Sequence, residues 1–459
     1  MPVEGAIADL SPVLGDKLTT AAAAREQHAH NEAHFPRALP DAVAFPESTA
    51  DVAAIVRACN LHRCPVVAFG AGTSLEGQHL ATSGGISLDM SRMARVLEIR
   101  AEDMVAVAQP GCTREGLNEA LRDSGLFFSV DPGANASLGG MAGTRASGTT
   151  AVRYGTMREN VLALEAVMAD GTVIRTGTAA RKSAAGYDLT HLLIGSEGTL
   201  WIITELTLRL HGLPEAVSAA TCRFETVEDA VNAVILTIQS GIPVVRIELV
   251  DEMMARGFNL HAGADLPEKP HLFLEFHGSP ATVAEQAAAF GAIAAEFGAT
   301  GFRWTDRADE CRALWRMRHD AHYAISRLNP VKRTLATDVC VPISRLAEAV
   351  TTAQAESRRL GLITAILGHV GDGNFHCGLR FDPDDAAERA RVEEFAATLA
   401  KTALSLGGTI TGEHGIGLGK IGYMQAQHGH ALAWMQAIKA AFDPNGILNP
   451  GKMLPTPGH

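Results

Sequence analysis

The sequence lacks three features that would place the protein outside the cytoplasm or across a membrane. Its seven cysteines form no Cys-x-x-Cys pair, and an odd count in a chain of 459 residues favours buried, reduced thiols over a disulfide framework. The first twenty residues hold no basic stretch followed by an apolar run, as a secretory signal would. No uninterrupted apolar stretch reaches the length of a membrane span. We therefore expect a cytoplasmic protein, with peripheral membrane contact through a partner left open.

Positively charged residues are also fewer than negatively charged ones. The chain carries 39 Lys and Arg against 51 Asp and Glu, which gives a formal net charge of -12 at pH 7. Nucleic acids and anionic membranes are bound through basic surfaces, so this balance argues against both as partners. Small molecules and proteins remain to be considered, and a homodimer is compatible with the composition.

Glycine, by contrast, is abundant, with 45 residues in the chain. Because glycine is used where the backbone bends sharply or approaches a ligand closely, its clusters mark the segments that build a site. The clusters lie at 70–85, 133–155, 195–198, 371–373 and 407–419. We therefore expect a site assembled from both ends of the chain.

The chain is too long for one ordinary hydrophobic core and should form two or three compact units. In the first part, a helix predicted at 49–60 is followed by a buried strand at 66–69 that leads into a glycine loop. Farther on, strand-like runs flank Asp170-Gly171, a dipeptide typical of two-residue hairpins. The sequence predicts a mixed α+β domain over residues 1–213.

After Pro214 the order of the predicted elements changes. A helix, two strands and a second helix follow one another near 226–297, and a similar order returns over 335–406. Two such α/β halves suggest an antiparallel, ferredoxin-like sheet with helices on one face. We expect this substrate or cap domain over 214–410, followed by a segment, 411–459, that returns to the first domain.

A glycine-rich loop follows the first buried strand. Gly70, Gly72, Thr73 and Ser74 can there offer backbone N–H groups to phosphate oxygens. Leu75 stands where the Gly-x-Gly-x-x-Gly fingerprint needs its third glycine, which argues against the usual dinucleotide-binding motif. A Gly-x-x-x-x-Gly-Lys-Ser/Thr loop is absent too, so a nucleoside triphosphatase is not indicated. On the residues alone, phosphate binding and a plain tight turn remain equally open.

Histidines and a glutamate gather in two other glycine-punctuated segments. One segment carries His369 and His376 on two predicted strands joined by a Val-Gly-Asp-Gly-Asn turn, so that the two side chains face each other across a hairpin. The other carries Glu413 and His414 in a Thr-Gly-Glu-His-Gly-Ile-Gly run. Two imidazoles and a carboxylate can hold a divalent cation and leave positions open for substrate oxygens. Asp and Asn of the turn are read as turn residues, with metal contact equally open.

Taken in chain order, these motifs resemble the FAD-linked oxidase family, which has the vanillyl-alcohol oxidase-type fold. The resemblance covers nearly the whole chain and implies an α+β protein, with an FAD-binding domain, a ferredoxin-like cap domain and a C-terminal segment that returns to the FAD domain. Each motif is weak alone, whereas their order is highly specific. The other segments that carry it are Ala44-Phe-Pro-Glu-Ser-Thr, Asp131-Pro-Gly-Ala, Gly139-Gly-Met-Ala, Ala146-Ser-Gly, Arg153-Tyr-Gly, Gly195-Ser-Glu-Gly-Thr-Leu and Phe442-Asp-Pro-Asn-Gly-Ile-Leu-Asn-Pro-Gly-Lys.

The resemblance implies that the first domain and the C-terminal segment hold FAD. Some covalently flavinylated relatives carry a histidine in or near the glycine loop, but His79 is out of that position. We therefore expect non-covalent FAD, with His79 a surface or packing residue. The residues that the resemblance assigns to the pyrophosphate are Gly70, Ala71, Gly72, Thr73 and Ser74, and those that it assigns to the rest of FAD are Pro132, Gly140, Gly148, Glu197, Gly198 and Ile203.

The histidine and glutamate motifs are similar to those of the D-lactate and D-2-hydroxyglutarate dehydrogenase branch of the family. This implies that His369, His376 and Glu413 bind one divalent metal, zinc or manganese in the first place, with iron also compatible. It also makes His414 the general base, which accepts the hydroxyl proton of a metal-chelated 2-hydroxy acid while the C2 hydrogen leaves as hydride to flavin N5. Arg318 matches a family arginine near the substrate carboxylate, and a solvated helix arginine is the alternative.

Smaller features point to the substrate. Segments at 246–251 and 337–346 resemble the cytochrome-type D-lactate dehydrogenases. Thr334 and Gly378 stand where the hydroxyglutarate enzymes carry a lysine-bearing segment and an asparagine, which favours a short monocarboxylate. We expect oxidation of D-lactate, with electrons passed to a cytochrome, quinone or flavoprotein. The alternatives are a D-2-hydroxyglutarate dehydrogenase, a glycolate oxidase flavin subunit, a non-redox FAD alkyl transferase, and a flavin-binding protein without catalysis.

Overall fold

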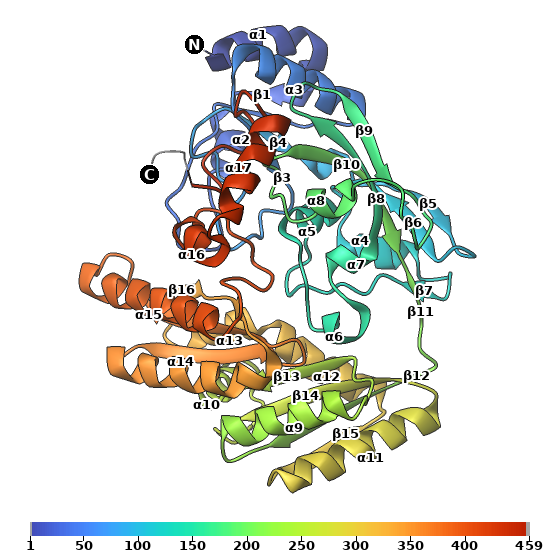
Figure 1. Cartoon of the computed structure of the whole chain (residues 1–459), viewed down its shortest axis with the longest axis vertical. Helices are drawn as coiled ribbons and strands as arrows, with labels where there is room; N and C mark the ends of the chain where they lie inside the picture. Colours follow the sequence, from blue (N-terminus) through green and yellow to red (C-terminus); the bar gives the residue numbers. More distant parts are fainter. Residues whose placement is uncertain (1, 456–459) are drawn as a thin grey trace. The chain divides into compact units, whose positions relative to one another are not determined.

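The computed structural model describes residues 2–455, and these divide into two compact units (Figure 1). The first unit comprises the chain up to Ala146, Thr156–Leu213 and the chain from Glu413 onward. The second comprises Ser147–Gly155 and Pro214–Gly412. The predicted division into 1–213, 214–410 and 411–459 differs from this chiefly in Ser147–Gly155, which the prediction placed in the first domain.

The first unit contains a small mainly parallel sheet of order β1-β2-β4-β3. Strands β2, β4 and β3 run parallel, and β1 pairs antiparallel with β2. Helix α3 begins where the Ser48 hydroxyl accepts a hydrogen bond from the backbone N–H of Asp51, and its buried face, with Ile55 and Val56, packs in the core of this sheet. The elements of this part are α1 (Pro2–Leu14), η1 (Gly15–Lys17), β1 (Leu18–Thr19), α2 (Ala22–Gln27), β2 (Ala42–Ala44), α3 (Thr49–His62), β3 (Val66–Phe69), β4 (Ile86–Asp89) and η2 (Met90–Arg92).

A second, antiparallel sheet of the first unit has the order β5-β6-β10-β8-β9. Strands β8 and β9 form the predicted hairpin around Asp170-Gly171, where Gly171 has φ +82°. The elements of this part are β5 (Val96–Arg100), β6 (Val105–Ala108), α4 (Arg114–Ala120), β7 (Leu126–Phe127), α5 (Leu138–Thr144), α7 (Met157–Asn160), β8 (Val161–Met168), β9 (Val173–Gly177), α8 (Leu189–Leu193), β10 (Trp201–Arg209) and β11 (His211–Gly212). Strands β7 and β11 pair with each other in a separate two-stranded sheet.

The C-terminal segment returns to the first unit, as predicted. After η4 (Ile421–Tyr423), α16 (Met424–His428) and α17 (Ala431–Phe442), the backbone N–H of Val66 in β3 donates to the carbonyl of Ile447 at 2.8 Å. The side chains of Ile447 and Leu448 lie in the same core as α3, and Lys452 Nζ donates to the carbonyl of Leu80 at 2.6 Å. The tail is therefore part of the core and of the hydrogen-bond pattern of this unit.

The second unit is built on one large antiparallel sheet of order β15-β12-β14-β13-β18-β19-β16, with β17 also paired to β19. The elements are α6 (Ala151–Tyr154), β12 (Ala216–Arg223), α9 (Val227–Gln239), β13 (Arg246–Val250), α10 (Glu252–Ala262), β14 (His271–Gly278), α11 (Pro280–Glu296), β15 (Thr300–Thr305), α12 (Ala308–His319), α13 (Ala321–Leu328), β16 (Arg333–Ala336), β17 (Val339–Cys340), η3 (Ile343–Arg345), α14 (Leu346–Leu360), β18 (Ile363–His369), β19 (Asn374–Phe381) and α15 (Ala386–Ser405).

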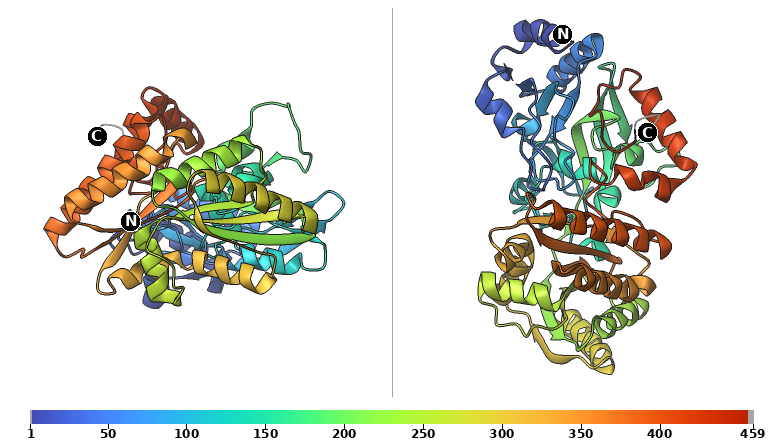
Figure 2. Two further views of the ribbon diagram at one scale, coloured as in Figure 1. Left: turned by 90° about the horizontal axis from the view of Figure 1, so that it is seen from below. Right: turned by 90° about the vertical axis from the view of Figure 1, so that its left-hand side faces the viewer.

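Helices cover both faces of this sheet, so the expectation of helices on one face was wrong. One core contains side chains of α9, α11, α14 and α15, and a separate core contains side chains of α10, α12 and α13. The ribbon views in Figure 2 show helices on both sides of the strands of this unit. Neighbouring strand residues alternate between them: Leu272 and Leu274 lie in the first core and Phe273 lies in the second. The second face therefore carries apolar side chains of its own and needs a covering layer.

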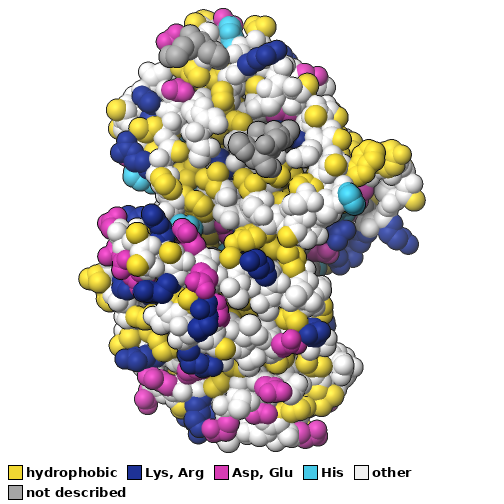
Figure 3. Space-filling view, turned by 60° about the vertical axis from the view of Figure 1, so that its left-hand side comes forward, with side chains coloured by type: hydrophobic (Ala, Val, Ile, Leu, Met, Phe, Trp, Pro, Cys, Tyr) yellow, Lys and Arg dark blue, Asp and Glu magenta, His cyan; other side chains and the backbone are white. Residues whose placement is uncertain are grey.

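Charged side chains of both signs are interspersed on the surface. On the face drawn in Figure 3, the described Lys and Arg residues form no continuous basic surface. No helix within residues 2–455 has the length and hydropathy to cross a bilayer. All seven cysteines are free thiols, of which Cys340 alone is partly exposed.

Candidate active site

Two histidines meet at the turn between β18 and β19. His369 ends β18, and His376 lies near the start of β19, opposite Leu367 in the strand register. Their rings are 5.4 Å apart between centroids and cross at 82°, and both side chains are buried. Gly373 in the turn has φ +78°, and a Cβ there would lie 2.0 Å from the carbonyl oxygen of Val341. The turn thus requires glycine, and the hairpin brings the histidines together.

The hydrogen bonds of the two rings indicate which nitrogen of each is available to a metal. His369 Nδ1 lies 2.7 Å from Glu248 Oε1, and His376 Nδ1 lies 3.3 Å from the carbonyl oxygen of Thr337. A carboxylate and a carbonyl accept hydrogen bonds, so each Nδ1 carries the proton. The lone pair on Nε2 of each ring is then the one available to a metal.

Glu248 is a buried residue of β13 that sequence reasoning missed. Its Oε2 accepts hydrogen bonds from Arg318 Nε at 2.9 Å and Arg318 Nη2 at 2.6 Å, while its Oε1 receives His369. Arg318 is thus buried and bound to a carboxylate, not solvated on its helix. The only signal in the sequence was a glutamate between isoleucine and leucine in a buried strand, in the segment Arg246-Ile-Glu-Leu-Val-Asp.

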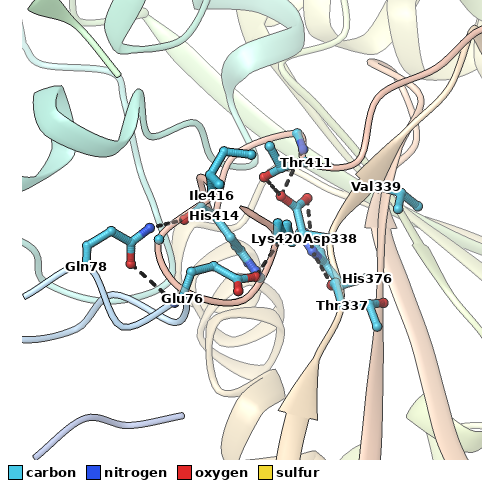
Figure 4. Close-up of polar contacts among 12 residues, drawn as sticks. Glu76, Gln78, Thr337, Asp338, Val339, His376, Thr411, His414, Ile416 and Lys420 are labelled. Carbon is cyan, nitrogen blue, oxygen red and sulfur yellow. Dashed lines mark hydrogen bonds and ion pairs between the residues drawn. The ribbon is translucent and has the colours of Figure 1, made fainter. Parts of the chain in front are cut away.

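Asp338 is the second buried carboxylate that sequence reasoning did not single out. Its Oδ2 accepts from the Thr411 hydroxyl at 2.6 Å and from the backbone N–H of Gly412 at 2.8 Å, and its Oδ1 accepts from Asn374 Nδ2 at 2.8 Å (Figure 4). A Cβ on Gly412 would lie 2.2 Å from Asn374 Nδ2. The hydrogen bond to Asp338 holds the Asn374 side chain. Asp338 thus connects the backbone of residues 411–412 to the hairpin between β18 and β19.

Glu413 follows Gly412 directly, so the bonds of Asp338 also limit where its carboxylate can lie. His369, His376 and Glu413 each offer one ligand atom, and these atoms all lie within 4.8 Å of one another. Two imidazole nitrogens and one carboxylate oxygen form a donor set that suits zinc or manganese. The residues present therefore fit a divalent cation.

The backbone around His414 is fixed by residues of the first unit. The carbonyl of His414 accepts from Gln78 Nε2 at 2.7 Å (Figure 4). The Glu197 carboxylate accepts from the N–H of Ile416 at 2.6 Å and of Gly417 at 2.8 Å. Burial raises the pKa of Glu197, and these two N–H groups oppose that shift because they stabilise the charged form. The predicted general base, His414, thus lies in a loop whose backbone forms hydrogen bonds with both Gln78 and Glu197.

The predicted pyrophosphate loop directly follows β3 and contains no helix. Gly70 lies so close to Ser137 that a Cβ would come within 2.2 Å of the Ser137 hydroxyl, and Gly72 has φ +72°. The Ser74 hydroxyl is bonded to His79 Nδ1 at 2.8 Å, and His79 is buried. His79 is therefore a packing residue of the loop.

The structure places the other residues predicted to contact FAD in different parts of the chain. Gly140, in α5, has its Cα 3.9 Å from the position of a Cβ on Gly70, so these two glycines meet. Ile203 is a core residue of β10, and Gly148 belongs to the second unit. Pro132 and Gly198 lie in loops, the latter with φ +68°.

Comparisons with known proteins agree with this arrangement. A family model described as FAD linked oxidases, C-terminal domain, matches residues 213–453, and an FAD binding domain model matches residues 40–177. A protein of Danio rerio named probable D-lactate dehydrogenase, mitochondrial, is 45% identical over 98% of this chain and 92% of its own length. One of Arabidopsis thaliana named D-lactate dehydrogenase [cytochrome], mitochondrial, is 44% identical over 98% of this chain and 80% of its own.

A solved structure gives the fold independently. Crystalline p-cresol methylhydroxylase with substrate bound superposes with a TM-score of 0.81, over 98% of this chain and 96% of that one, at 16% identity. The fold is thus the vanillyl-alcohol oxidase type, as expected. With a family model over more than half of its length and relatives above 40% identity, the chain belongs to the FAD-linked oxidase family.

Proposed function

We propose that the protein oxidises D-lactate, or a similar short D-2-hydroxy acid, to the 2-oxo acid. The observation that carries this proposal is the convergence of His369, His376 and Glu413 within 4.8 Å in a chain that belongs to the FAD-linked oxidases. The two relatives above 40% identity are both named D-lactate dehydrogenases, and this favours lactate over the other hydroxy acids and over alkyl transfer.

FAD, bound without a covalent link, would supply the two-electron oxidant for the reaction. The glycine loop from Gly70 to Ser74 would offer its backbone N–H groups to the pyrophosphate, because Gly70 and Gly72 carry no side chain of their own. Gly140 lies beside Gly70 and extends the surface without a side chain. Pro132, Gly148, Glu197, Gly198 and Ile203 remain proposed contacts of the other parts of the cofactor.

His369, His376 and Glu413 would hold a zinc or manganese ion. When bound, the ion would lower the pKa of the substrate hydroxyl that chelates it. His414, next in the chain to Glu413, would take the hydroxyl proton, since an imidazole titrates close to neutral pH. The hydrogen bonds to Gln78 and Glu197 hold the backbone of this loop, which would favour proton transfer because less reorganisation is needed.

Arg318 would bind the substrate carboxylate. Glu248 occupies Nε and Nη2 of its guanidinium, so we assign this contact to Nη1. Such a contact is charge-assisted and orients the acid without changing its redox chemistry.

The surroundings of Gly378 favour a short acid. This glycine lies in β19, and a Cβ there would come within 2.5 Å of Ile325 Cδ1. An asparagine, as the hydroxyglutarate enzymes carry at this position, would require Ile325 to move, and with glycine here a second carboxylate lacks that partner. Thr334, on the neighbouring strand, is bonded to Arg380 through its hydroxyl.

The proposed function is tested by steady-state kinetics with an artificial acceptor. We expect kcat/KM for D-lactate to exceed that for D-2-hydroxyglutarate, glycolate and L-lactate by at least tenfold, about 1.4 kcal/mol of transition-state free energy. Comparable values for D-lactate and D-2-hydroxyglutarate would contradict the assignment, and no turnover with any hydroxy acid would favour the alkyl transferase alternative.

Partners and location are proposed from the relatives and from the composition. We propose a cytochrome as the electron acceptor because the Arabidopsis relative is named for one, with a quinone or flavoprotein as the alternatives. Both relatives are named mitochondrial, whereas the free cysteines fit any reducing compartment, the cytoplasm included. Reduction of cytochrome c by the enzyme and D-lactate tests the first proposal.

A further inference from the structure

Glu248 and His369 lie opposite each other on neighbouring strands. Strand β13 pairs with β18 in a register that places Glu248 against His369, and the two side chains are joined by the bond of 2.7 Å between Oε1 and Nδ1. Glu248 is fully buried. A buried carboxylate is unstable unless its charge is compensated, and here Arg318 donates two hydrogen bonds to its other oxygen. The three residues form the chain Arg318–Glu248–His369.

We infer that Glu248 is a positioning residue, which holds His369 in the tautomer and ring orientation that a metal requires, and that the two hydrogen bonds from Arg318 orient the Glu248 carboxylate for this purpose. The inference rests on the proposed metal site. A carboxylate behind a metal-binding imidazole fixes the proton on the distal nitrogen and makes the ligating nitrogen more basic. His376 Nδ1 lies 3.3 Å from the carbonyl oxygen of Thr337 and 3.6 Å from Asp338 Oδ1. The carboxylate contact of His369, at 2.7 Å, is the shorter of the two, so Glu248 is the carboxylate to test.

The same sheet contains a second Arg–Glu–His group that serves as a control. Arg246 Nη1 donates to Glu275 Oε2 at 3.1 Å, and Glu275 Oε1 lies 2.9 Å from His277 Nε2. Glu275 lies in β14 and is nearly as buried as Glu248. Because His277 is not part of the metal-binding group, the loss of Glu275 removes a buried carboxylate with equal effect on charge and no effect on the proposed ligands.

The experiment is a calorimetric titration of the FAD-containing protein with Zn²⁺ after treatment with a chelator. The variants are Glu248→Gln, its control Glu275→Gln, and His369→Ala. The double variant E248Q/R318M removes both buried charges together, so it stays informative if the single variant fails to fold. Visible spectra of the Co²⁺-loaded proteins report whether the ligand geometry changes.

We expect Glu248→Gln and the double variant to bind Zn²⁺ about 10–100-fold more weakly than wild type and to alter the Co²⁺ spectrum, whereas Glu275→Gln leaves both unchanged. Equal Zn²⁺ affinity of wild type and both Glu248 variants, with affinity lost in His369→Ala, would overturn the positioning role and leave the metal site standing. A wild-type protein that binds neither Zn²⁺ nor Mn²⁺ would instead refute the metal site itself. Equal weakening by Glu275→Gln would also overturn the inference, because it would show a general effect of buried charge.

Discussion

The carboxylate of Asp338 accepts a 2.8 Å hydrogen bond from the backbone N–H of Gly412, the residue before Glu413. It also binds Thr411 and Asn374, so one buried side chain connects the hairpin to the segment that carries the third proposed ligand. The proposed ligand Glu413 thus follows a segment that is held by Asp338, a carboxylate to which sequence reasoning gave no role.

Replacement of Asp338 by alanine leaves three donors without their acceptor. We expect the free energy of unfolding to fall by about 3 kcal/mol, because each lost bond to a charged group costs about 1.5–3 kcal/mol and partial solvation recovers some of this. Urea denaturation measures the change. Thr411→Val, which removes one of the bonds, should cost about 1 kcal/mol. Equal losses of unfolding free energy in Asp338→Ala and Thr411→Val would show that the other two hydrogen bonds of Asp338 do not contribute to stability.

Replacement of Glu197 by alanine should loosen the loop of His414. The N–H groups of Ile416 and Gly417 lose a buried acceptor, which costs about 2 kcal/mol or more of unfolding free energy. We expect kcat to fall with little change in Zn²⁺ affinity, since Asp338 still holds the segment before Glu413. A variant that loses Zn²⁺ affinity and keeps kcat would argue against this division of roles.

Loss of the proposed base, His414, and loss of the proposed metal ligand, His369, should have different effects on bound metal. His414→Ala should keep FAD and metal but lose flavin reduction by D-lactate, because no group then accepts the hydroxyl proton. His369→Ala should lose flavin reduction and bound metal together. Flavin spectra and elemental analysis of the purified variants separate the two cases. Full activity in either variant would refute the proposed site.

Arg318→Lys tests whether Arg318 binds the substrate in addition to forming hydrogen bonds with Glu248. Lysine keeps the positive charge and loses the planar fork, so it cannot serve both partners. We expect KM for D-lactate to rise about tenfold, since one charge-assisted hydrogen bond contributes about 1.5–3 kcal/mol. An unchanged KM together with weaker Zn²⁺ binding would restrict Arg318 to the support of Glu248.

The stability of the second unit should depend on Asp251 at neutral pH. This residue caps α10 through a 2.7 Å bond from the N–H of Met254, and burial raises its pKa from 3.8 to about 8. Between about pH 4 and pH 8 the unfolded chain has lost a proton that the folded protein keeps, so stability falls as pH rises, by up to about 1.4 kcal/mol per unit. Asp251→Asn keeps a capping oxygen and does not titrate. It should be more stable than wild type at pH 8 and similar to it at pH 4, as measured by urea denaturation; a constant difference would exclude this titration.

The hairpin that carries His369 and His376 could be predicted because the residues that indicate it lie close together in the sequence. His369, His376 and the glycines between them lie within eight residues of chain, and period-two strands joined by a glycine turn place such side chains together. The glycine loop after β3 and the returning tail were predicted for the same reason, from short segments whose order is specific. That His369, His376 and Glu413 bind metal, and that His414 is the base, stay predictions.

The support of the site could not be predicted, because it depends on long-range pairing. Glu248 meets His369 across 121 positions of sequence, and the register of β13 on β18 decides whether they meet at all. The helices on the second sheet face were missed for a related reason. Leu272, Phe273 and Leu274 form a continuous apolar run, which means burial on both faces, but such a run was read as a strand with one covered side.

The most direct test of the account is anaerobic mixing of the purified protein with D-lactate, L-lactate, glycolate or D-2-hydroxyglutarate, with and without a chelator, while the visible absorption of the oxidised flavin is followed. We predict rapid bleaching by D-lactate, much slower bleaching by the other acids, and loss of the reaction in the chelator with recovery on addition of Zn²⁺ or Mn²⁺. Bleaching that is insensitive to the chelator would contradict the role of His369, His376 and Glu413, and no bleaching by any acid would contradict the proposed oxidation itself.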